Sequence, residues 1–232
     1  MLKIKKSILA FIIATAGFFS CKQSSNSKKD IIETKVSDSI KNINNKNTFN
    51  DKDIYTKYKY ADSAGKNILI KNGFPRGGLK YTDKNGDQYS YAVFWTQITN
   101  ETDNPIELTM DFPLNAYEVP SLPDKYYKIL IPNDTMTLEK FPLFLYGLTN
   151  LESYLDNNIH KSASLNRTIN SRESNGFYIV ILCLTEGAHG TMRTELSVKG
   201  KNLFYEIKVD GSRNNGKSSN KKINCGSINL KN

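Results

Sequence analysis

Histidine and cysteine are the side chains of this sequence best suited to nucleophilic or metal chemistry, and both are scarce. The 232 residues include two histidines and three cysteines. Glu186 and His189 could share a metal ion, and Cys183 with His189 has the composition of a nucleophile and its base. A solvated loop and an inert thiol inside an apolar strand explain the same residues more simply. We therefore expect no catalytic residue, no metal site, no cofactor and no enzyme.

The first 21 residues have the pattern of an export signal. Lys3, Lys5 and Lys6 precede an apolar run, residues 7–20, that is too short to span a bilayer as a stable helix. The run ends in Phe18-Phe19-Ser20-Cys21, which resembles the lipobox of bacterial, Bacteroidota-type envelope lipoproteins. The resemblance implies that Cys21 is acylated and begins the mature chain. The alternative is an ordinary secretory signal whose cysteine is incidental.

The lipobox-like segment predicts attachment to a bacterial membrane. Two acyl chains suffice for stable membrane attachment, so no transmembrane helix is needed. Lys22 directly after the cysteine resembles the signals that send lipoproteins to the outer membrane. Surface lipoproteins often continue with acidic residues, whereas the first acid here is Asp30. The periplasmic and the surface face of the membrane therefore both stay open.

The formal net charge of +9 does not indicate a nucleic-acid partner, because the positive charge lies outside the expected domain. Residues 60–209 carry fifteen basic and seventeen acidic side chains. A groove for a phosphate backbone would need basic residues clustered on the folded part itself. We therefore expect no nucleic-acid partner.

Composition divides the chain into four parts. Residues 1–20 are the signal peptide, and residues 21–58 are rich in Lys, Asn and Ser, which predicts a lipidated flexible stalk. Residues 59–209 are long enough for one domain with a substantial core. Residues 210–232 are interpreted as a polar linker and a C-terminal segment.

Period-2 alternation predicts strands within the domain. Ile106 to Phe112 and Leu203 to Val209 alternate apolar with polar residues, as a strand with one buried face requires. Asn85-Gly86 predicts a tight turn of a hairpin, and residues 199–202 predict a second. The run Phe177 to Leu184 is apolar on both faces and predicts a central strand.

One short helix is expected near 149–158, where Thr149 to Glu152 matches a capping box. Many short strands with Pro-rich turns predict an all-β, mainly antiparallel fold, an immunoglobulin-like β-sandwich. Trp95 is interpreted as core rather than as a ligand platform.

Two cysteines follow the lipidation site. In an oxidising envelope Cys183 and Cys225 could form a disulfide that ties the C-terminal segment to the sheet. The alternative is that Cys183 is a buried apolar residue and that Cys225 stays reduced.

Three short motifs, at Ser39, Ser63 and Thr135, consist of Asp followed by Ser or Thr and an apolar residue. They resemble the O-glycosylation sites of Bacteroidota envelope proteins. The alternative is that these are turn or cap residues.

Together these observations predict a membrane-anchored lipoprotein with a non-catalytic β-sandwich that binds an envelope protein or a glycan. Aromatic residues among turn residues, Tyr117, Tyr126 and Tyr127, are the expected ligand contacts. The alternative function is an envelope hydrolase with a pair of carboxylates that the sequence does not identify. The oligomeric state is left open.

Overall fold

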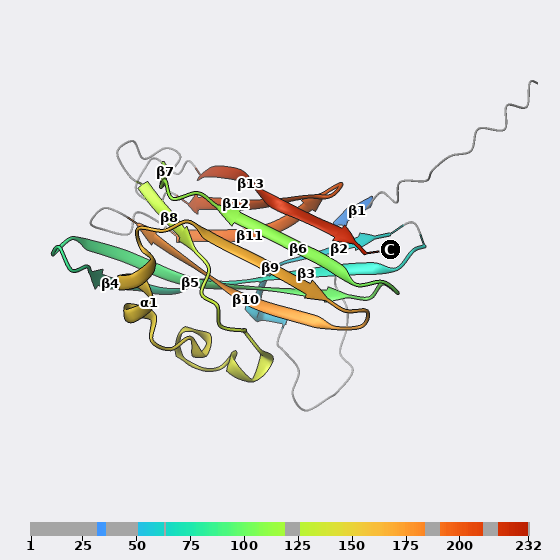
Figure 1. Cartoon of the computed structure of the whole chain (residues 1–232), viewed down its shortest axis with the longest axis horizontal. Coiled ribbons are helices and arrows are strands. Elements are labelled where there is room, and N and C mark those ends of the chain that lie inside the picture. Colours follow the sequence, from blue (N-terminus) through green and yellow to red (C-terminus); the bar gives the residue numbers. More distant parts are fainter. Residues whose placement is uncertain are drawn as a thin grey trace, which may run out of the picture.

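The computed structural model describes residues 32–35, 51–62, 64–118, 126–183, 191–210 and 218–231. The described residues form two antiparallel sheets, one helix and three 3-10 turns. The sheets pack face to face as a sandwich, which confirms the predicted all-β class (Figure 1). Among the described residues there are thirteen strands, more than the roughly seven to nine of an immunoglobulin domain.

The larger sheet has eight strands in the order β1-β2-β3-β5-β10-β8-β7, with β4 paired to β5. Their bounds are β1 Ile32–Lys35, β2 Ile54–Ala61, β3 Asn67–Gly73, β4 Arg76–Thr82, β5 Gln88–Asn100, β7 Tyr117–Glu118, β8 Tyr126–Leu130 and β10 Ser174–Cys183. The smaller sheet has five strands in the order β11-β12-β13-β6-β9. Their bounds are β6 Ile106–Phe112, β9 Ala163–Ile169, β11 Thr191–Lys199, β12 Asn202–Asp210 and β13 Ser218–Leu230.

Strands β5 and β10 lie at the centre of the larger sheet, and residues 93–96 and 176–182 are buried on both faces. Phe177 to Leu182 are all at most 2% exposed, so the prediction of a doubly covered strand is confirmed. One face packs on the smaller sheet. The other face is covered by the segment between β8 and β9, which holds η2 Leu138–Lys140, η3 Phe144–Gly147 and α1 Leu151–Asn158 (Figure 1).

The predicted alternating strands and hairpins are confirmed. Strand β6 alternates buried and exposed residues along its whole length, and β12 buries the predicted Leu203, Tyr205, Ile207 and Val209, with Glu206 buried as well. The β4–β5 hairpin turns at Gly86, which has φ +88°. The Asp83 side chain accepts hydrogen bonds from the N–H groups of Asn85 and Asp87, both at 2.9 Å.

The helix is where the sequence indicated, but its N-terminal cap differs. Asn150 is the N-cap, in the left-handed region at φ 53°, and no side chain caps the helix. The predicted capping box from Thr149 to Glu152 is therefore wrong, because its geometry requires an extended cap residue. The predicted apolar face is confirmed in Leu151, Leu155 and Ile159, which are buried.

The C-terminal segment belongs to the domain, so the predicted boundary at residue 209 is too early. Strand β13 lies between β12 and β6 and pairs with both. It buries Ile223, Cys225 and Ile228 against the core. Backbone pairing with β12 and β6, rather than a disulfide at the end of a polar linker, holds this segment in place.

The domain also begins before residue 59. Strand β2 starts at Ile54, and β1 lies within the segment predicted as stalk. Ordering the four residues of β1 costs about 1–2 kcal/mol each, whereas each hydrogen bond contributes about 0.5–1.5 kcal/mol. Pairing of β1 with β2 is therefore marginal in free energy.

The edge of the smaller sheet at β11 is closed by side chains from the larger sheet. The Asn72 side chain accepts a hydrogen bond from Leu196 N–H at 2.9 Å and donates one to the Leu196 carbonyl at 3.1 Å. Tyr60 Oη accepts a hydrogen bond from Val198 N–H at 2.8 Å. These side chains take the position of a neighbouring strand and join the two sheets.

Candidate functional site

Among the described residues, three of the five large apolar side chains that are exposed lie in one short segment, residues 138–147, called here the apolar loop. Leu138 is 45% exposed, Leu143 52% and Phe144 75%. Such side chains are normally buried, and an exposed cluster of them is typical of interaction surfaces. The apolar loop is therefore the candidate functional site.

The backbone of the loop explains why these side chains face solvent. Leu145, Tyr146 and Gly147 have φ values of 48°, 58° and 70°. Left-handed backbone costs about 1–2 kcal/mol for each residue that is not glycine. The turn directs Leu145 and Tyr146 into the protein, where both are buried, and leaves the preceding Leu143 and Phe144 outside.

Tyr146 anchors this strained turn to the larger sheet. Its hydroxyl donates a hydrogen bond to the Phe74 carbonyl at 2.7 Å, and its own carbonyl accepts one from Tyr178 Oη at 2.8 Å. Its ring meets the ring of Trp95 edge-on at 6.3 Å. Burial raises the pKa of the Tyr146 phenol, so the anchor is neutral at physiological pH.

Trp95 is a core residue, as the sequence indicated. It is 1% exposed and packs edge-on against Phe141 as well as Tyr146. A Cβ at Gly73 would lie 2.0 Å from the indole nitrogen of Trp95. Glycine at 73 therefore leaves the space that the indole fills beneath the loop.

Two cations support the loop from within. The Arg76 guanidinium lies 4.0 Å from the Tyr146 ring centroid and 5.2 Å from that of Phe141. It also donates a hydrogen bond to the Leu143 carbonyl. Lys140 Nζ donates to the Thr135 carbonyl at 2.8 Å. Both cations thus interact with backbone carbonyls of the protein, and Arg76 also interacts with aromatic rings of the loop.

This arrangement is suited to binding an apolar surface. Leu138, Leu143 and Phe144 present carbon atoms to solvent on a backbone that the anchors hold in one conformation. A preorganised loop loses little conformational entropy on binding.

The tyrosines predicted as ligand contacts come together, but mostly inside the protein. Tyr117 and Tyr127 are opposed in the β7–β8 pair and their rings stack at 5.9 Å. Tyr127 is fully buried and Tyr117 is half-buried, whereas Tyr126 is 42% exposed. Tyr126 is therefore the one residue of the three that offers a large surface to a ligand.

The two sheet cysteines lie in different sheets. Cys183 ends β10 and is half-buried. Cys225 is a buried free thiol in β13, and it approaches the Leu203 carbonyl at 3.5 Å. The structure therefore does not contain the Cys183–Cys225 disulfide. Burial raises the pKa of the Cys225 thiol to about 12.

Several predicted residues fall outside the described part of the chain. These are Cys21, Ser39, Ser63, Glu186 and His189. Thr135 is described and is exposed between β8 and η2, in an isolated bridge to Phe177.

Two buried carboxylates lie next to each other in the smaller sheet. Glu195 and Glu206 are opposed on β11 and β12 and are 5% and 8% exposed. Lys208 Nζ lies 3.0 Å from Glu195 Oε1 and 4.0 Å from Glu206 Oε1. The carboxylates stand side by side on one face of a sheet, with a lysine between them. This is the geometry of a structural ion network rather than of two facing catalytic acids.

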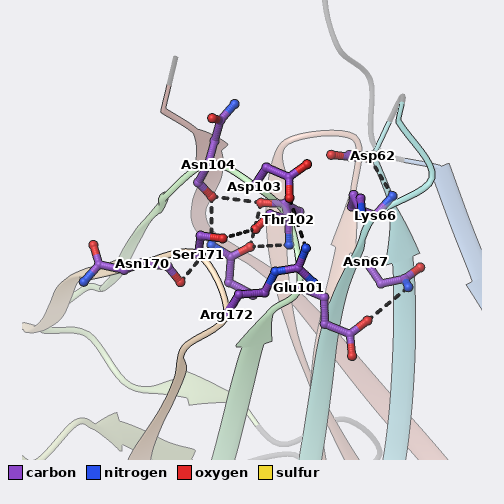
Figure 2. Close-up of polar contacts among 11 residues, drawn as sticks. Asp62, Lys66, Asn67, Glu101, Thr102, Asp103, Asn104, Asn170, Ser171 and Arg172 are labelled. Carbon is purple, nitrogen blue, oxygen red and sulfur yellow. Dashed lines mark hydrogen bonds and ion pairs between the residues drawn. The ribbon is translucent and has the colours of Figure 1, made fainter.

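One end of the sandwich is closed by a polar network centred on Asn100. Figure 2 labels Thr102, Asn104 and Asn170, which surround it. Asn100 is fully buried and its amide donates to the carbonyls of Asn104, Ile169 and Asn170 at 2.9–3.1 Å. Its oxygen accepts from Thr102 N–H and Oγ1. The surrounding exposed groups include the ion pair of Arg172 with Asp103 at 3.1 Å. Groups of the protein itself satisfy the hydrogen-bonding atoms of the Asn100 side chain. Because these partners come from both loops, the network joins the β5–β6 loop to the β9–β10 loop.

Within the described ranges, no group of three or more His, Cys, Asp or Glu side chains could hold a metal ion. The same residues include no helix long and apolar enough to cross a bilayer.

Comparison with known proteins gave no match: no family model, no curated protein and no solved structure is significantly similar to this chain.

The apolar loop was missed by sequence reasoning. Pro142-Leu143-Phe144-Leu145 has the composition of core, and only the left-handed turn at Leu145 and Tyr146 separates the exposed pair from the buried pair. A run of apolar residues directly after a proline in a turn-rich region was the available signal.

Proposed function

We propose that this protein is a non-enzymatic, lipid-anchored binding protein of the bacterial outer membrane whose apolar loop contacts another envelope protein. The observation that carries the proposal is the exposure of Leu138, Leu143 and Phe144 on a strained, anchored backbone. Strain is retained in a fold when surrounding contacts determine it, and it concentrates at functional sites.

A protein is favoured over a glycan by the chemistry of the loop. A sugar needs polar groups that bind its hydroxyls, whereas Arg76 and Lys140 donate to carbonyls of the chain itself. Apart from the exposed carboxylate of Glu139, what the loop offers to a ligand is the aliphatic and aromatic carbon of Leu138, Leu143 and Phe144. Aromatic anchors that fill a pocket of a partner dominate the affinity of many protein interfaces.

Attachment to the membrane rests on the lipobox-like segment at Cys21. Growth with labelled palmitate should mark the parent protein and not the Cys21→Ser variant. Equal labelling of both proteins, or secretion of the parent into the medium, would contradict the anchor. Acylation and the face of the membrane are independent of the loop, so the two parts of the proposal are tested separately.

The loop is tested with a photo-cross-linking amino acid at position 144 in the full-length chain, in cells. We expect a discrete adduct that the Leu143→Ser substitution weakens about ten-fold or more, because each buried apolar anchor contributes strongly to affinity. Leu114 is 51% exposed and is the matched control. The same cross-linker at 114 should give no such adduct, and Leu114→Ser should not weaken the adduct at 144. Identical adducts from 144 and 114 would contradict the site.

Modification is a separate proposal. Thr135 is exposed, and we propose that it carries an O-glycan together with Ser39 and Ser63. Intact mass should fall in steps when each of these residues is replaced by alanine. An unmodified mass of the processed parent chain would rule the glycans out.

A further inference from the structure

The apolar loop contains four consecutive apolar side chains, of which the first two lie outside the protein and the next two inside. Leu143 is 52% exposed and Phe144 75%, whereas Leu145 and Tyr146 are buried. Leu143 and Leu145 are the same residue type, so hydrophobicity does not decide which of them faces solvent. Contacts with the rest of the structure therefore select this arrangement.

Arg76 contacts the loop on both sides of the point where its side chains turn inward. Its guanidinium donates a hydrogen bond to the Leu143 carbonyl, before that point, and lies 4.0 Å from the centroid of the Tyr146 ring, after it. The centroid of the Phe141 ring lies at 5.2 Å. A planar guanidinium can place its face on a ring while an N–H group at its edge donates to a carbonyl, and the ammonium of lysine lacks this geometry. Arg76 therefore links the exposed pair of side chains to the buried pair.

A bulge at the start of β4 places Arg76 on the face of the sheet that the loop covers. Arg76 lies opposite Val93 and Leu79 lies opposite Tyr91, so three steps along β4 match two along β5. Val93 and Tyr91 share a face with Trp95, whose ring contacts the loop. Without the extra residue, positions 76 and 79 would lie on opposite faces of the sheet.

Two glycines form this bulge. Gly77 has φ +151°, and an added Cβ would lie 2.6 Å from the Cα atom of Ala92 on β5. Gly78 has φ +76°. Residues with a side chain rarely adopt such positive φ values. The sequence Arg76-Gly77-Gly78 thus fixes the position from which the guanidinium reaches the loop.

We propose that Arg76 is a positioning residue of the binding site. It determines that the pair Leu143–Phe144, rather than the two residues after it, faces the partner. Its effect on binding rests on the proposed function, whereas the exposure of the side chains can be measured without a partner.

The test compares Arg76→Lys and Arg76→Met in the full-length chain by hydroxyl-radical footprinting with mass spectrometry. Oxidation follows the exposure of a side chain, so the parent should be oxidised far more at Phe144 than at Tyr146, each normalised to the chain in urea. Both substitutions should lower this ratio at least about three-fold, because neither new side chain can stack on the Tyr146 ring and donate to the Leu143 carbonyl together.

The control is Lys80→Met, an exposed position on the same strand, which should leave the oxidation ratio unchanged. A native circular dichroism spectrum verifies that each variant folds, and Arg76→Lys is the milder change should Arg76→Met fail to fold. A role of Arg76 in overall stability alone would leave the ratio of the folded variants at the parent value. That result would overturn the proposal.

The photo-cross-linking amino acid at position 144 supplies the binding readout. Its adduct should weaken in Arg76→Met about as strongly as in Leu143→Ser, because both substitutions disturb the same exposed pair. If the parent forms no adduct but the oxidation ratio falls as expected, the proposed function fails and the positioning role of Arg76 stands. If the parent forms the adduct and the ratio of the folded Arg76 variants does not change, the positioning role fails and the proposed function stands.

Discussion

At the scale of single residues, burial decides which polar groups react and which hold the fold. Asn100 and Cys225 are both buried, yet the Asn100 side chain makes five hydrogen bonds whereas the Cys225 thiol makes only a weak contact with a carbonyl. Removing the Asn100 side chain leaves buried backbone groups without hydrogen-bond partners. Burial of the Cys225 thiol lowers its reactivity. Each difference can be measured.

Cys225 should resist alkylation while the protein is folded. A thiol whose pKa is about 12 is deprotonated in about one molecule in ten thousand at pH 8, and the thiolate is the reactive form. In a Cys183→Ser background, mass spectrometry should find Cys225 unlabelled by iodoacetamide in buffer and fully labelled in urea.

The same experiment on the parent chain tests the disulfide that the sequence left open. If the parent labels at neither Cys183 nor Cys225 in urea until a reductant is added, the two residues are bonded. Labelling without reductant supports the reduced thiols of the structure.

Asn100→Ala should be among the most damaging polar substitutions. It leaves the Ile169 carbonyl and the Thr102 N–H in the core without their hydrogen-bond partner. Unsatisfied buried groups cost about 1–3 kcal/mol each, so we expect the free energy of unfolding to fall by about 3 kcal/mol or more. Urea denaturation measures it. Asn166→Ala, on the exposed face of β9, is the control and should change stability by less than about 0.5 kcal/mol.

At the scale of the elements, prediction succeeded where the information is local. The alternation of β6 and β12 and the doubly apolar β10 follow directly from burial on one face or both. The apolar face of the helix could also be predicted from local sequence. The N-terminal cap of the helix could not be predicted in this way, because the left-handed backbone conformation of Asn150 depends on the path of the strained loop before it.

Prediction failed where pairing partners are distant. Strand β13 has polar residues around Ile223, Cys225 and Ile228, and a register shift in its ladder with β12 breaks the period. Strand β13 forms its backbone hydrogen bonds with β12 and β6, and its own sequence pattern does not predict this pairing. The exposure of Phe144 likewise depends on the anchoring of Tyr146 by Phe74 and Tyr178, far away in sequence.

Gly226→Ala tests the position of β13 inside the sheet. Gly226 has φ +146°, and an added Cβ would lie 1.9 Å from the Thr109 carbonyl oxygen on β6. We expect a loss of at least about 3 kcal/mol, from strained backbone and overpacking together. Thermal and urea unfolding of the full-length chain measure it.

Gly65→Ala is the matched control for backbone strain alone. Gly65 also has positive φ, at +74°, but an added Cβ would meet no atom within 4 Å. Its cost should be about 1–2 kcal/mol. If the two substitutions cost the same, β13 does not pack against β6 as described.

At the scale of the whole molecule, the core is rich in tyrosine. We therefore expect the free energy of unfolding to depend on pH in the alkaline range. Burial raises the pKa of Tyr178 and of Tyr154 to about 12. In the unfolded chain a tyrosine titrates near about 10. The folded state therefore keeps protons that the unfolded state loses between these values.

The sign of the effect follows from this difference. A pKa raised on folding contributes stability that is fully present below the unfolded value and is lost as pH rises through the folded value. Lys208, whose pKa Glu195 raises against the opposing effect of burial, acts in the same direction at high pH. We therefore expect unfolding between about pH 10 and pH 12, with tyrosinate absorbance and loss of circular dichroism rising together and reversing on return to pH 8. In Tyr178→Phe the dependence on pH should be shallower, because one proton-linked group is gone. Tyrosinate absorbance that rises near pH 10 while the circular dichroism stays native would contradict the burial of these phenols.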